Sequence, residues 1–431
     1  MLSYSETLNW IYNLRGGVID LRLDRMDRAL SLFDHPEKKF LSFHIAGTNG
    51  KGSTAAMLHR ILSLGGYRAA LYTSPHLVSF TERIRIGDQE ISPEDVVTLA
   101  EEIRQRTAAA SVPLTFFEFV TVMAFIYFAR HQVDVAVIEV GLGGRLDATN
   151  LVKPVVSVIT TISKDHQAYL GDDLLSIARE KGGIIKPGVP VVCGALPPEV
   201  ETLLKGVAEE HGAKAHFLGR DFSFSLKNKA LFNYTGIKQH FSDLALALSG
   251  RHQRSNGSVA LAALEAAHDA FPVSDAAIRK GLATVEWPGR FETILDRPTV
   301  ILDGAHNGEG VKALVEEIED FRQGRKIRLL FASMEDKDWR LMLGVLSAVA
   351  DEIVLTRVEM ARSADPHQLA CQLTGKVSHR VVENSPSALR SLLDAARPDD
   401  IVLVAGSLYL LGEIRPMVLE IAAAGSGHSK T

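Results

Sequence analysis

A glycine-rich segment near the start of the chain, Gly47-Thr48-Asn49-Gly50-Lys51-Gly52-Ser53, has the residue types that bind phosphate. Its glycines let backbone N–H groups turn toward an anion, and a helix beginning here adds the positive end of its dipole. Lys51 offers a mobile positive charge for the outer phosphates, and Ser53 offers a hydroxyl for magnesium. The segment predicts an ATP site with Mg²⁺.

The match to the usual Walker pattern is imperfect, because Ile45 stands where its first glycine falls and Gly52 separates the lysine from the hydroxyl. The alternative is a glycine-rich turn with an incidental lysine. However, the apolar run Phe40–Ala46 predicts a strand before the segment, and the pattern over Thr54–Leu64 predicts a helix after it. This strand, loop and helix order favours a phosphate loop.

Three polar residues follow apolar runs that read as parallel strands, namely Ser74, Glu139 and His166. Ligands of an open parallel sheet lie at the carboxyl ends of its strands, so these side chains would face the phosphate loop. Taken singly, they could be a turn residue, a solvated strand end and a hydrogen-bonded loop histidine. At this edge the Glu139 carboxylate could hold magnesium directly or through water, Ser74 could offer one oxygen, and His166 could reach the same place.

Further candidates lie later in the chain. Lys181 ends a helical pattern, where a lysine is typically an exposed charge that complements the dipole. Asp303 and His306 close what reads as the first strand of a second domain, where polar groups can face a cleft. Arg290 lies on the Pro- and Gly-containing segment Glu286–Arg290, which resembles a hinge, and could clamp phosphate oxygens as a fork donor.

The fold class is α/β. Apolar runs alternate with amphipathic helical patterns, which predicts a mainly parallel sheet, and residues 222–248 alternate in period two, which predicts a small antiparallel patch. A second series of strands and helices begins at Val300. We therefore expect two domains, residues 1–295 and 296–431.

Composition excludes several classes of protein. A net charge of -5 gives no reason to expect nucleic acid, and no apolar run approaches a membrane span. The N-terminal sequence lacks a signal peptide pattern, and Cys193 and Cys371 are too few and too far apart for a disulfide framework. We expect a cytoplasmic protein.

Ten segments in order carry a resemblance to a known family. They are AGTNGKGS (46–53), TSPHLVSFTERIRI (73–86), LTFFEFVTVMAF (114–125), EVGLGGRLDATN (139–150), DHQAYLG (165–171), IAREKGGIIKPG (177–188), HQRSN (252–256), WPGRFE (287–292), LDGAHN (302–307) and GSLYLLGE (406–413). The chain resembles the folylpolyglutamate synthase / dihydrofolate synthase family, relatives of the Mur ligases.

The resemblance implies an N-terminal ATPase domain and a smaller Rossmann-like C-terminal domain, with a monomeric chain. Together with the residues above, it predicts these catalytic residues: Lys51, Glu139, His166 and Lys181. It predicts these nucleotide contacts: Gly47, Thr48, Asn49, Gly50, Lys51, Gly52, Ser53, Asn256, Arg290, Asp303 and His306. The predicted metal ligands are Ser53, Ser74, Glu139 and His166. Lys181 matches a lysine that the family carbamylates, and a monovalent cation is a possible further cofactor.

The resemblance also implies segments that bind a pterin substrate: Ile19, Asp20, Leu21, Thr115, Phe116, Phe117, Glu118, Leu146, Asp147 and Ala148. The two phenylalanines offer a stacking face and Asp147 a hydrogen-bonding carboxylate, although plain core packing is the alternative for the phenylalanines. Arg22 replaces a usual glycine, which leaves substrate preference open, and Gly182 replaces a usual alanine.

The predicted reaction is ATP-dependent addition of L-glutamate to dihydropteroate, to a reduced folate, or to both, through an acyl phosphate. Two alternatives are a ligase of UDP-linked peptidoglycan precursors and a nucleotide-binding regulator. The first has an additional N-terminal domain, for which the residues before Gly47 are too few. The second would not need Glu139, His166 and Lys181 together.

Overall fold

The computed structural model describes residues 2–14, 23–165, 167–373, 375 and 377–426. The chain divides into two compact units, which are Met1–Ala247 with Gln253–Glu286 and Leu248–His252 with Trp287–Thr431. The second junction lies inside the hinge-like segment Glu286–Arg290. Residue 295, where the sequence suggested the boundary, falls in strand β12 (Glu292–Asp296).

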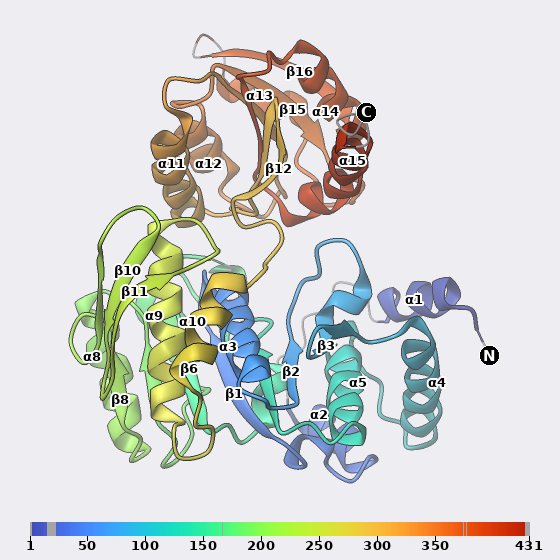
Figure 1. Cartoon of the computed structure of the whole chain (residues 1–431). Coiled ribbons are helices and arrows are strands. Elements are labelled where there is room, and N and C mark those ends of the chain that lie inside the picture. Colours follow the sequence, from blue (N-terminus) through green and yellow to red (C-terminus); the bar gives the residue numbers. More distant parts are fainter. Residues whose placement is uncertain (1, 15–22, 166, 374, 376, 427–431) are drawn as a thin grey trace. The chain divides into compact units, whose positions relative to one another are not determined.

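The first unit is built on an eight-stranded sheet, shown in Figure 1, with the order β4-β3-β2-β5-β1-β6-β7-β8. Its strands are β1 Leu41–Ala46, β2 Ala69–Tyr72, β3 Ile84–Ile86, β4 Gln89–Glu90, β5 Val135–Glu139, β6 Val156–Ile159, β7 Val191–Cys193 and β8 Ala215–Phe217. The apolar runs at 40–46, 68–72, 133–140, 155–161 and 189–193 predict five strands. They are confirmed as β1, β2, β5, β6 and β7, which pair in parallel. The sequence patterns did not predict β3, β4 and β8, because strands this short contain too few residues to show a periodic alternation of apolar and polar side chains.

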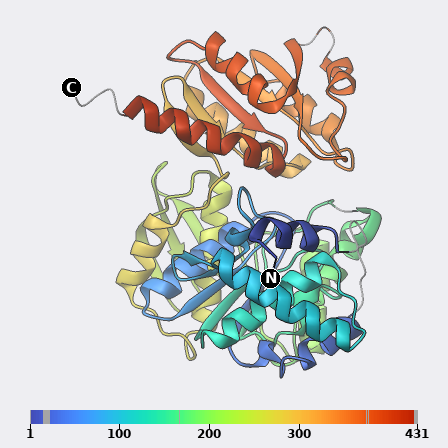
Figure 2. The ribbon, with the colours of Figure 1, turned by 90° about the vertical axis from the view of Figure 1, so that its right-hand side faces the viewer.

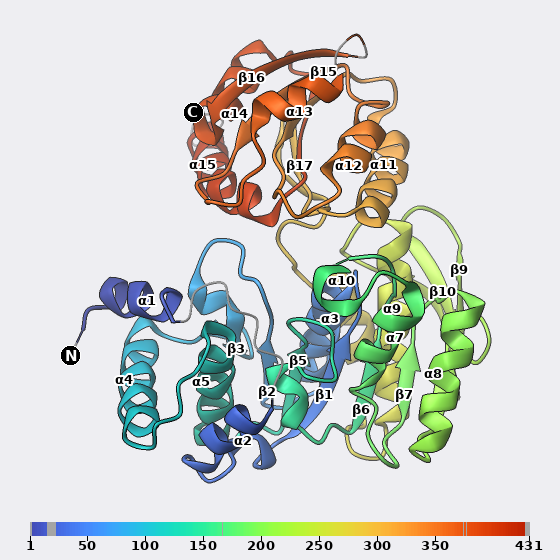
Figure 3. The ribbon, with the colours of Figure 1, turned by 180° about the vertical axis from the view of Figure 1, so that it is seen from behind.

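Helices cover both faces of this sheet, as Figures 1 and 3 show from opposite sides. The helices are α1 Tyr4–Tyr12, α2 Asp24–Ser31, α3 Lys51–Leu64, α4 Pro93–Ala109, α5 Phe116–Arg130, α6 Gln167–Leu170, α7 Leu174–Gly182, α8 Pro198–Glu210, α9 Arg251–Ala266 and α10 Asp275–Thr284. One core packs α1, α2, α4 and α5 on β2 and β5, and a second packs α7 and α8 on β6 and β7. The helix α5 is apolar all round, as its burial requires.

The predicted antiparallel patch is confirmed as a separate three-stranded sheet of β9 Ser223–Leu226, β10 Leu231–Thr235 and β11 His240–Ala245. Its hairpin turn is fixed by Glu265 of α9, whose carboxylate accepts hydrogen bonds from the backbone N–H groups of Lys238 and Gln239.

The second unit has a six-stranded sheet with the order β12-β13-β17-β14-β15-β16, and the unit is drawn in gold to red in Figure 2. Its strands after β12 are β13 Thr299–Leu302, β14 Ile327–Phe331, β15 Glu352–Arg357, β16 Ser378–Asn384 and β17 Ile401–Ala405. The helices are α11 Gly308–Arg322, α12 Trp339–Leu346, α13 Pro366–Leu373, α14 Ser385–Ala395 and α15 Leu408–Ser426. The interpretation of β13 as the first strand is wrong, since β12 precedes it and pairs antiparallel.

No helix in the described part of the chain combines the length and apolar character needed to cross a bilayer.

Candidate active site

The segment 47–53 lies between β1 and α3, so the predicted strand, loop and helix order is confirmed. Gly47 and Gly50 have φ values of 152° and 85°, which favour glycine. A Cβ atom would lie 1.9 Å from Thr160 Oγ1 at Gly47 and 2.4 Å from Asn256 Oδ1 at Gly50. Neither position accepts a side chain, because the loop backbone packs directly against Thr160 and Asn256.

Two lysine side chains converge on this loop. Lys51 Nζ donates to the carbonyl oxygens of Gly47 at 3.1 Å and Thr48 at 3.3 Å, and Lys181 Nζ donates to the same Gly47 oxygen at 2.9 Å. Glu139 Oε1 lies 4.0 Å from Lys51 Nζ. The arrangement places two potential cations and one carboxylate around one carbonyl.

Lys181 is not the exposed helix-end charge that its sequence position suggested. It is 5% exposed, because the end of α7 packs beneath the loop 141–145, where Arg145 N donates to the carbonyl of Glu180 at 2.7 Å. Burial, followed by the nearby charge of Lys51, lowers the pKa of Lys181 to about 7. The lowered pKa favours the neutral amine form of Lys181, in comparison with an exposed lysine.

The edge formed by Glu139 and Ser74 suits a hard divalent cation. Glu139 ends β5 and is buried, and its Oε2 accepts a hydrogen bond from Ser74 N at 3.2 Å. Ser53 lies in the first turn of α3 and is also buried. A carboxylate with serine hydroxyls is the oxygen chemistry that Mg²⁺ prefers when phosphate and water complete its shell. Among the described residues no cluster of three or more His, Cys, Asp or Glu is present, and His166 lies outside them.

Asn256 is buried in α9 with its amide oriented toward the loop. Its Nδ2 donates to Gln253 Oε1 at 3.0 Å, which leaves Oδ1 as the atom nearest to Gly50. Gln253 is 1% exposed and belongs to the HQRSN motif, yet it was absent from the predicted residues. The sequence could have indicated Gln253 because it precedes Asn256 by three residues, a spacing that places two side chains on the same face of a helix.

The first predicted acceptor segment, Thr115 to Glu118, is tied into the protein. Glu118 Oε2 accepts from Thr115 N and Oγ1, both at 2.8 Å, as a capping box that begins α5. Arg25 of α2 donates to both oxygens of Glu118, with a shortest distance of 2.6 Å. The carboxylate is thus held by protein donors.

The second predicted acceptor segment, Leu146 to Ala148, is held in a similar way through Asp147. Asp147 Oδ1 accepts from Thr149 N and Oγ1, and Oδ2 accepts from Leu142 N at 2.8 Å. Thr149 Oγ1 also contacts His44 Nε2 at 2.8 Å, so His44 must donate there. Burial raises the pKa of Asp147, and burial lowers that of His44 to about 3. Every described oxygen of this carboxylate has a protein donor.

Phe116 and Phe117 are half-buried. They are therefore neither fully packed core residues nor fully exposed stacking faces. The Phe116 ring stacks on Tyr12 with centroids 5.5 Å apart, and the Arg83 guanidinium lies 5.3 Å from its centroid. Phe117 lies 6.2 Å from Tyr72 and covers Gly141. The predicted residues Ile19, Asp20 and Leu21 lie outside the described residues.

In the second unit, Asp303 follows β13 and accepts hydrogen bonds from Phe291 N and Ala305 N, both at 2.9 Å. Burial raises the pKa of Asp303, opposed by the charge of Arg290. His306 Nδ1 donates to the carbonyl of Gly304 at 2.8 Å. These three predicted residues therefore gather at the carboxyl end of β13.

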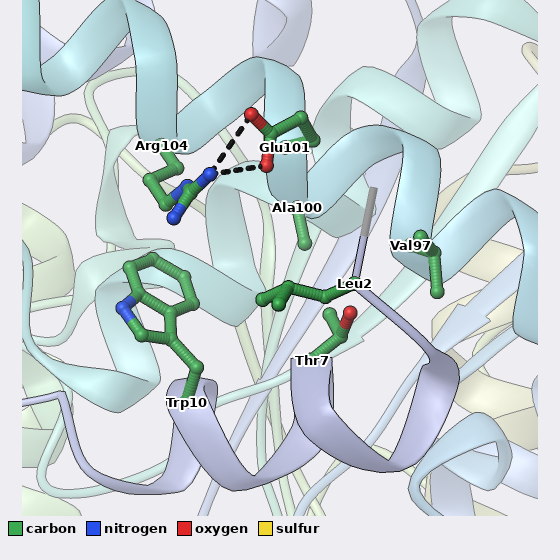
Figure 4. A pocket seen from close by; sticks show the side chains of 7 residues that line it. All are labelled: Leu2, Thr7, Trp10, Val97, Ala100, Glu101 and Arg104. Atoms are coloured by element: carbon green, nitrogen blue, oxygen red, sulfur yellow. Dashed lines mark hydrogen bonds and ion pairs between the residues drawn. The ribbon is translucent and has the colours of Figure 1, made fainter.

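A separate shallow hollow lies between α1 and α4 (Figure 4). It is lined by Leu2, Thr7, Trp10, Val97, Ala100, Glu101 and Arg104. Its only drawn charges, Glu101 and Arg104, bind each other at 2.7 Å. The hollow contains none of the predicted site residues.

Comparison with known proteins places this geometry in a family. The Mur ligase middle domain matches residues 45–264, and the Mur ligase, glutamate ligase domain matches residues 289–408. The dihydrofolate synthase/folylpolyglutamate synthase of Bacillus subtilis is 34% identical, covering 96% of this chain and 98% of its own. The Escherichia coli enzyme of the same description is 34% identical, covering 95% and 94%.

The chain belongs to the folylpolyglutamate synthase / dihydrofolate synthase family of Mur ligases. As a member of this family it is a Mur-type ATP-dependent ligase. Solved structures agree in fold. E. coli FolC in complex with DHPP and ADP has a TM-score of 0.90 and 33% identity, covering 97% of this chain and 98% of that chain. The bifunctional enzyme from Yersinia pestis, complexed with AMPPNP and Mn ion, has a TM-score of 0.88 and 34% identity, covering 97% and 98%.

Proposed function

We propose that this chain joins the amino group of L-glutamate to the carboxylate of a pteroate or folate, with release of ADP and phosphate. The acceptor is dihydropteroate, a reduced folate that already carries glutamate, or both. The observation that carries the proposal is the convergence of Lys51 and Lys181 on the loop beside Glu139, in a chain that matches this family almost end to end.

The chemistry follows from the poor reactivity of a carboxylate toward amines, since its leaving group would be oxide. An acceptor carboxylate oxygen attacks the γ-phosphorus of ATP, and the bond to the β–γ bridging oxygen breaks to release ADP. The glutamate nitrogen then attacks the acyl carbon, loses a proton and displaces phosphate. Neither step needs a nucleophile from the protein.

The described residues supply charge and orientation for these steps. Lys51 leaves the carbonyls of Gly47 and Thr48 to bind the transferring phosphoryl group, whose negative charge it neutralises. Glu139, Ser53 and Ser74 would hold magnesium, which supplies positive charge to the phosphate oxygens. His166 is a further proposed ligand from outside the described residues.

Asn256 on the loop side, and Arg290, Asp303 and His306 in the second unit, are proposed to bind the nucleotide. The half-buried faces of Phe116 and Phe117 are proposed to hold the pterin, together with Leu146, Ala148 and residues 19–21.

We propose that Lys181 is carbamylated. A neutral amine attacks CO₂ and loses a proton, and the lowered pKa of Lys181 favours that neutral form. The product replaces a cation by an anion beside the phosphate loop. Intact-mass spectrometry of the undigested protein, kept in bicarbonate at neutral pH, would detect the added CO₂. A requirement for a monovalent cation also remains a proposal, tested by replacing K⁺ with a bulky organic cation.

A product assay tests the proposed function. Purified protein receives MgATP and L-glutamate with dihydropteroate or tetrahydrofolate in separate reactions, and mass spectrometry detects one added glutamate residue. Addition to both acceptors establishes a bifunctional synthase. Addition to one restricts the activity, and addition to neither contradicts the proposal. We also propose that the enzyme acts as a monomer in the cytoplasm, which light scattering and fractionation test.

A further inference from the structure

Residues 160–163, which follow β6, are joined to residues 48 and 49 of the phosphate loop by hydrogen bonds of side-chain hydroxyls. Thr161 Oγ1 accepts a hydrogen bond from Asn49 N at 3.0 Å and donates to Asn49 O at 3.1 Å. Thr160 Oγ1 donates to the same carbonyl at 2.7 Å. The backbone N–H and the backbone carbonyl of Asn49 are therefore both held by hydroxyls at the end of β6.

The adjacent loop residue makes a matching pair of bonds in the opposite sense. Thr48 Oγ1 donates to Ser163 O at 3.1 Å and accepts from Ser163 N at 3.1 Å. Thr48 N also donates to Thr161 O at 2.8 Å. We call these bonds between residues 160–163 and residues 48–49 the hydroxyl bridge.

The hydroxyl bridge sits where regular pairing ends. Strand β1 pairs with β6 only as far as Ala46 and Ile159, and α3 does not begin until Lys51. The intervening backbone must be held by other donors and acceptors, because a buried backbone group without a partner is costly. Thr160 is 1% exposed and Thr48 is 8% exposed, so water competes little for their bonds, whereas Thr161 and Ser163 are partly buried.

We propose that Thr161 is a positioning residue for ATP, acting through the hydroxyl bridge to hold the phosphate loop in its binding shape before the nucleotide arrives. This rests on the proposed function. Thr161 is not among the residues predicted to touch ATP, and its hydroxyl is occupied by Asn49. A loop that is ordered in advance loses less conformational entropy on binding, so removing the hydroxyl should weaken nucleotide binding.

The test compares Thr161→Val, which removes the hydroxyl at nearly constant shape, with Thr161→Ser, which keeps it. Thr107→Val is the matched control, because the buried Thr107 hydroxyl donates to the carbonyl of Ile103 within α4, away from the loop. Isothermal titration calorimetry measures ATP affinity, and steady-state kinetics measures KM for ATP and for the acceptor.

We expect Thr161→Val to weaken ATP binding about tenfold, which is the loss of one or two hydrogen bonds. KM for ATP should rise alike, while KM for the acceptor stays constant. Thr161→Ser should retain wild-type affinity within about twofold, and Thr107→Val should leave ATP affinity unchanged.

Unchanged ATP affinity in Thr161→Val would overturn the inference, as would an equal rise of both KM values in proportion to lost thermal stability. If Thr161→Val does not fold, Thr160→Val removes the other hydroxyl that donates to Asn49 O, and it carries the same expectation and the same contrary outcome. A wild-type chain that fails to bind ATP overturns the proposed function along with this inference, whereas normal wild-type ligation with unaffected variants overturns this inference alone.

Discussion

The phosphate loop and the acceptor segments of the first unit hold their charged groups differently. Lys51 and Lys181 rest on backbone carbonyls, neutral acceptors that a phosphate can replace. Glu118 and Asp147, by contrast, each accept several hydrogen bonds from protein donors. The difference teaches that the nucleotide side keeps its charges available for chemistry. The proposed acceptor segments use their carboxylates to hold the backbone in place, and we propose that the aromatic faces recognise the acceptor.

The largest effect should come from Lys51. Lys51→Met removes the mobile charge that the proposal assigns to phosphoryl transfer, so kcat should fall about 10³-fold with the fold intact. Steady-state kinetics and circular dichroism measure the two quantities. Lys205→Met, on the exposed face of α8, is the matched control and should keep wild-type activity. Near-normal turnover of Lys51→Met would mean that the loop is not the phosphate site.

Loss of the ion pair between Arg25 and Glu118 should lower the stability of the protein more than its activity. Arg25→Met leaves the buried Glu118 carboxylate without its charged partner, which should lower the free energy of unfolding by about 3 kcal/mol. Chemical denaturation measures this. The double variant with Glu118→Gln should recover part of the loss, because the unpaired charge is gone. A fall in kcat for Arg25→Met without a fall in stability would instead give Glu118 a direct part in the reaction.

Phe116 tests whether the aromatic face, rather than the carboxylates, recognises the acceptor. Phe116→Ala should raise KM for the pterin acceptor about tenfold, the usual worth of one aromatic stack, and leave KM for ATP unchanged. Phe116→Tyr keeps the face and serves as the control. An unchanged KM for the acceptor in Phe116→Ala would show that residues other than Phe116 recognise the pterin.

A further prediction concerns the dependence of stability on pH. Burial lowers the pKa of Lys181 in the folded chain to about 7 from the ordinary lysine value of 10.5, so the unfolded chain binds more protons between these pH values. Stability should therefore rise with pH from about 7 to about 10 through this residue, with a slope of at most about 1.4 kcal/mol per pH unit. Denaturation of the wild type and of Lys181→Met in CO₂-free buffer isolates the contribution. Identical slopes would show that Lys181 is not buried as a neutral amine.

Sequence patterns predicted the parts of the molecule whose structure is local. The order of β1, phosphate loop and α3 follows from apolar periodicity and glycines, and the five parallel strands follow from apolar runs. The burial of Lys181 could not be predicted, since it depends on the loop 141–145 packing over the end of α7. The partner of Glu118 also lies far away in the sequence, at Arg25. Such contacts arise from tertiary packing, which local spacing does not encode.

The central claim is that ATP bound at the phosphate loop activates the acceptor carboxylate as an acyl phosphate. An acceptor with ¹⁸O in its carboxylate tests this most directly, with mass spectrometry of the phosphate released during a single round of ligation. The account predicts that one ¹⁸O atom passes from the acceptor to the phosphate for every amide formed. Ligation with unlabelled phosphate would contradict it.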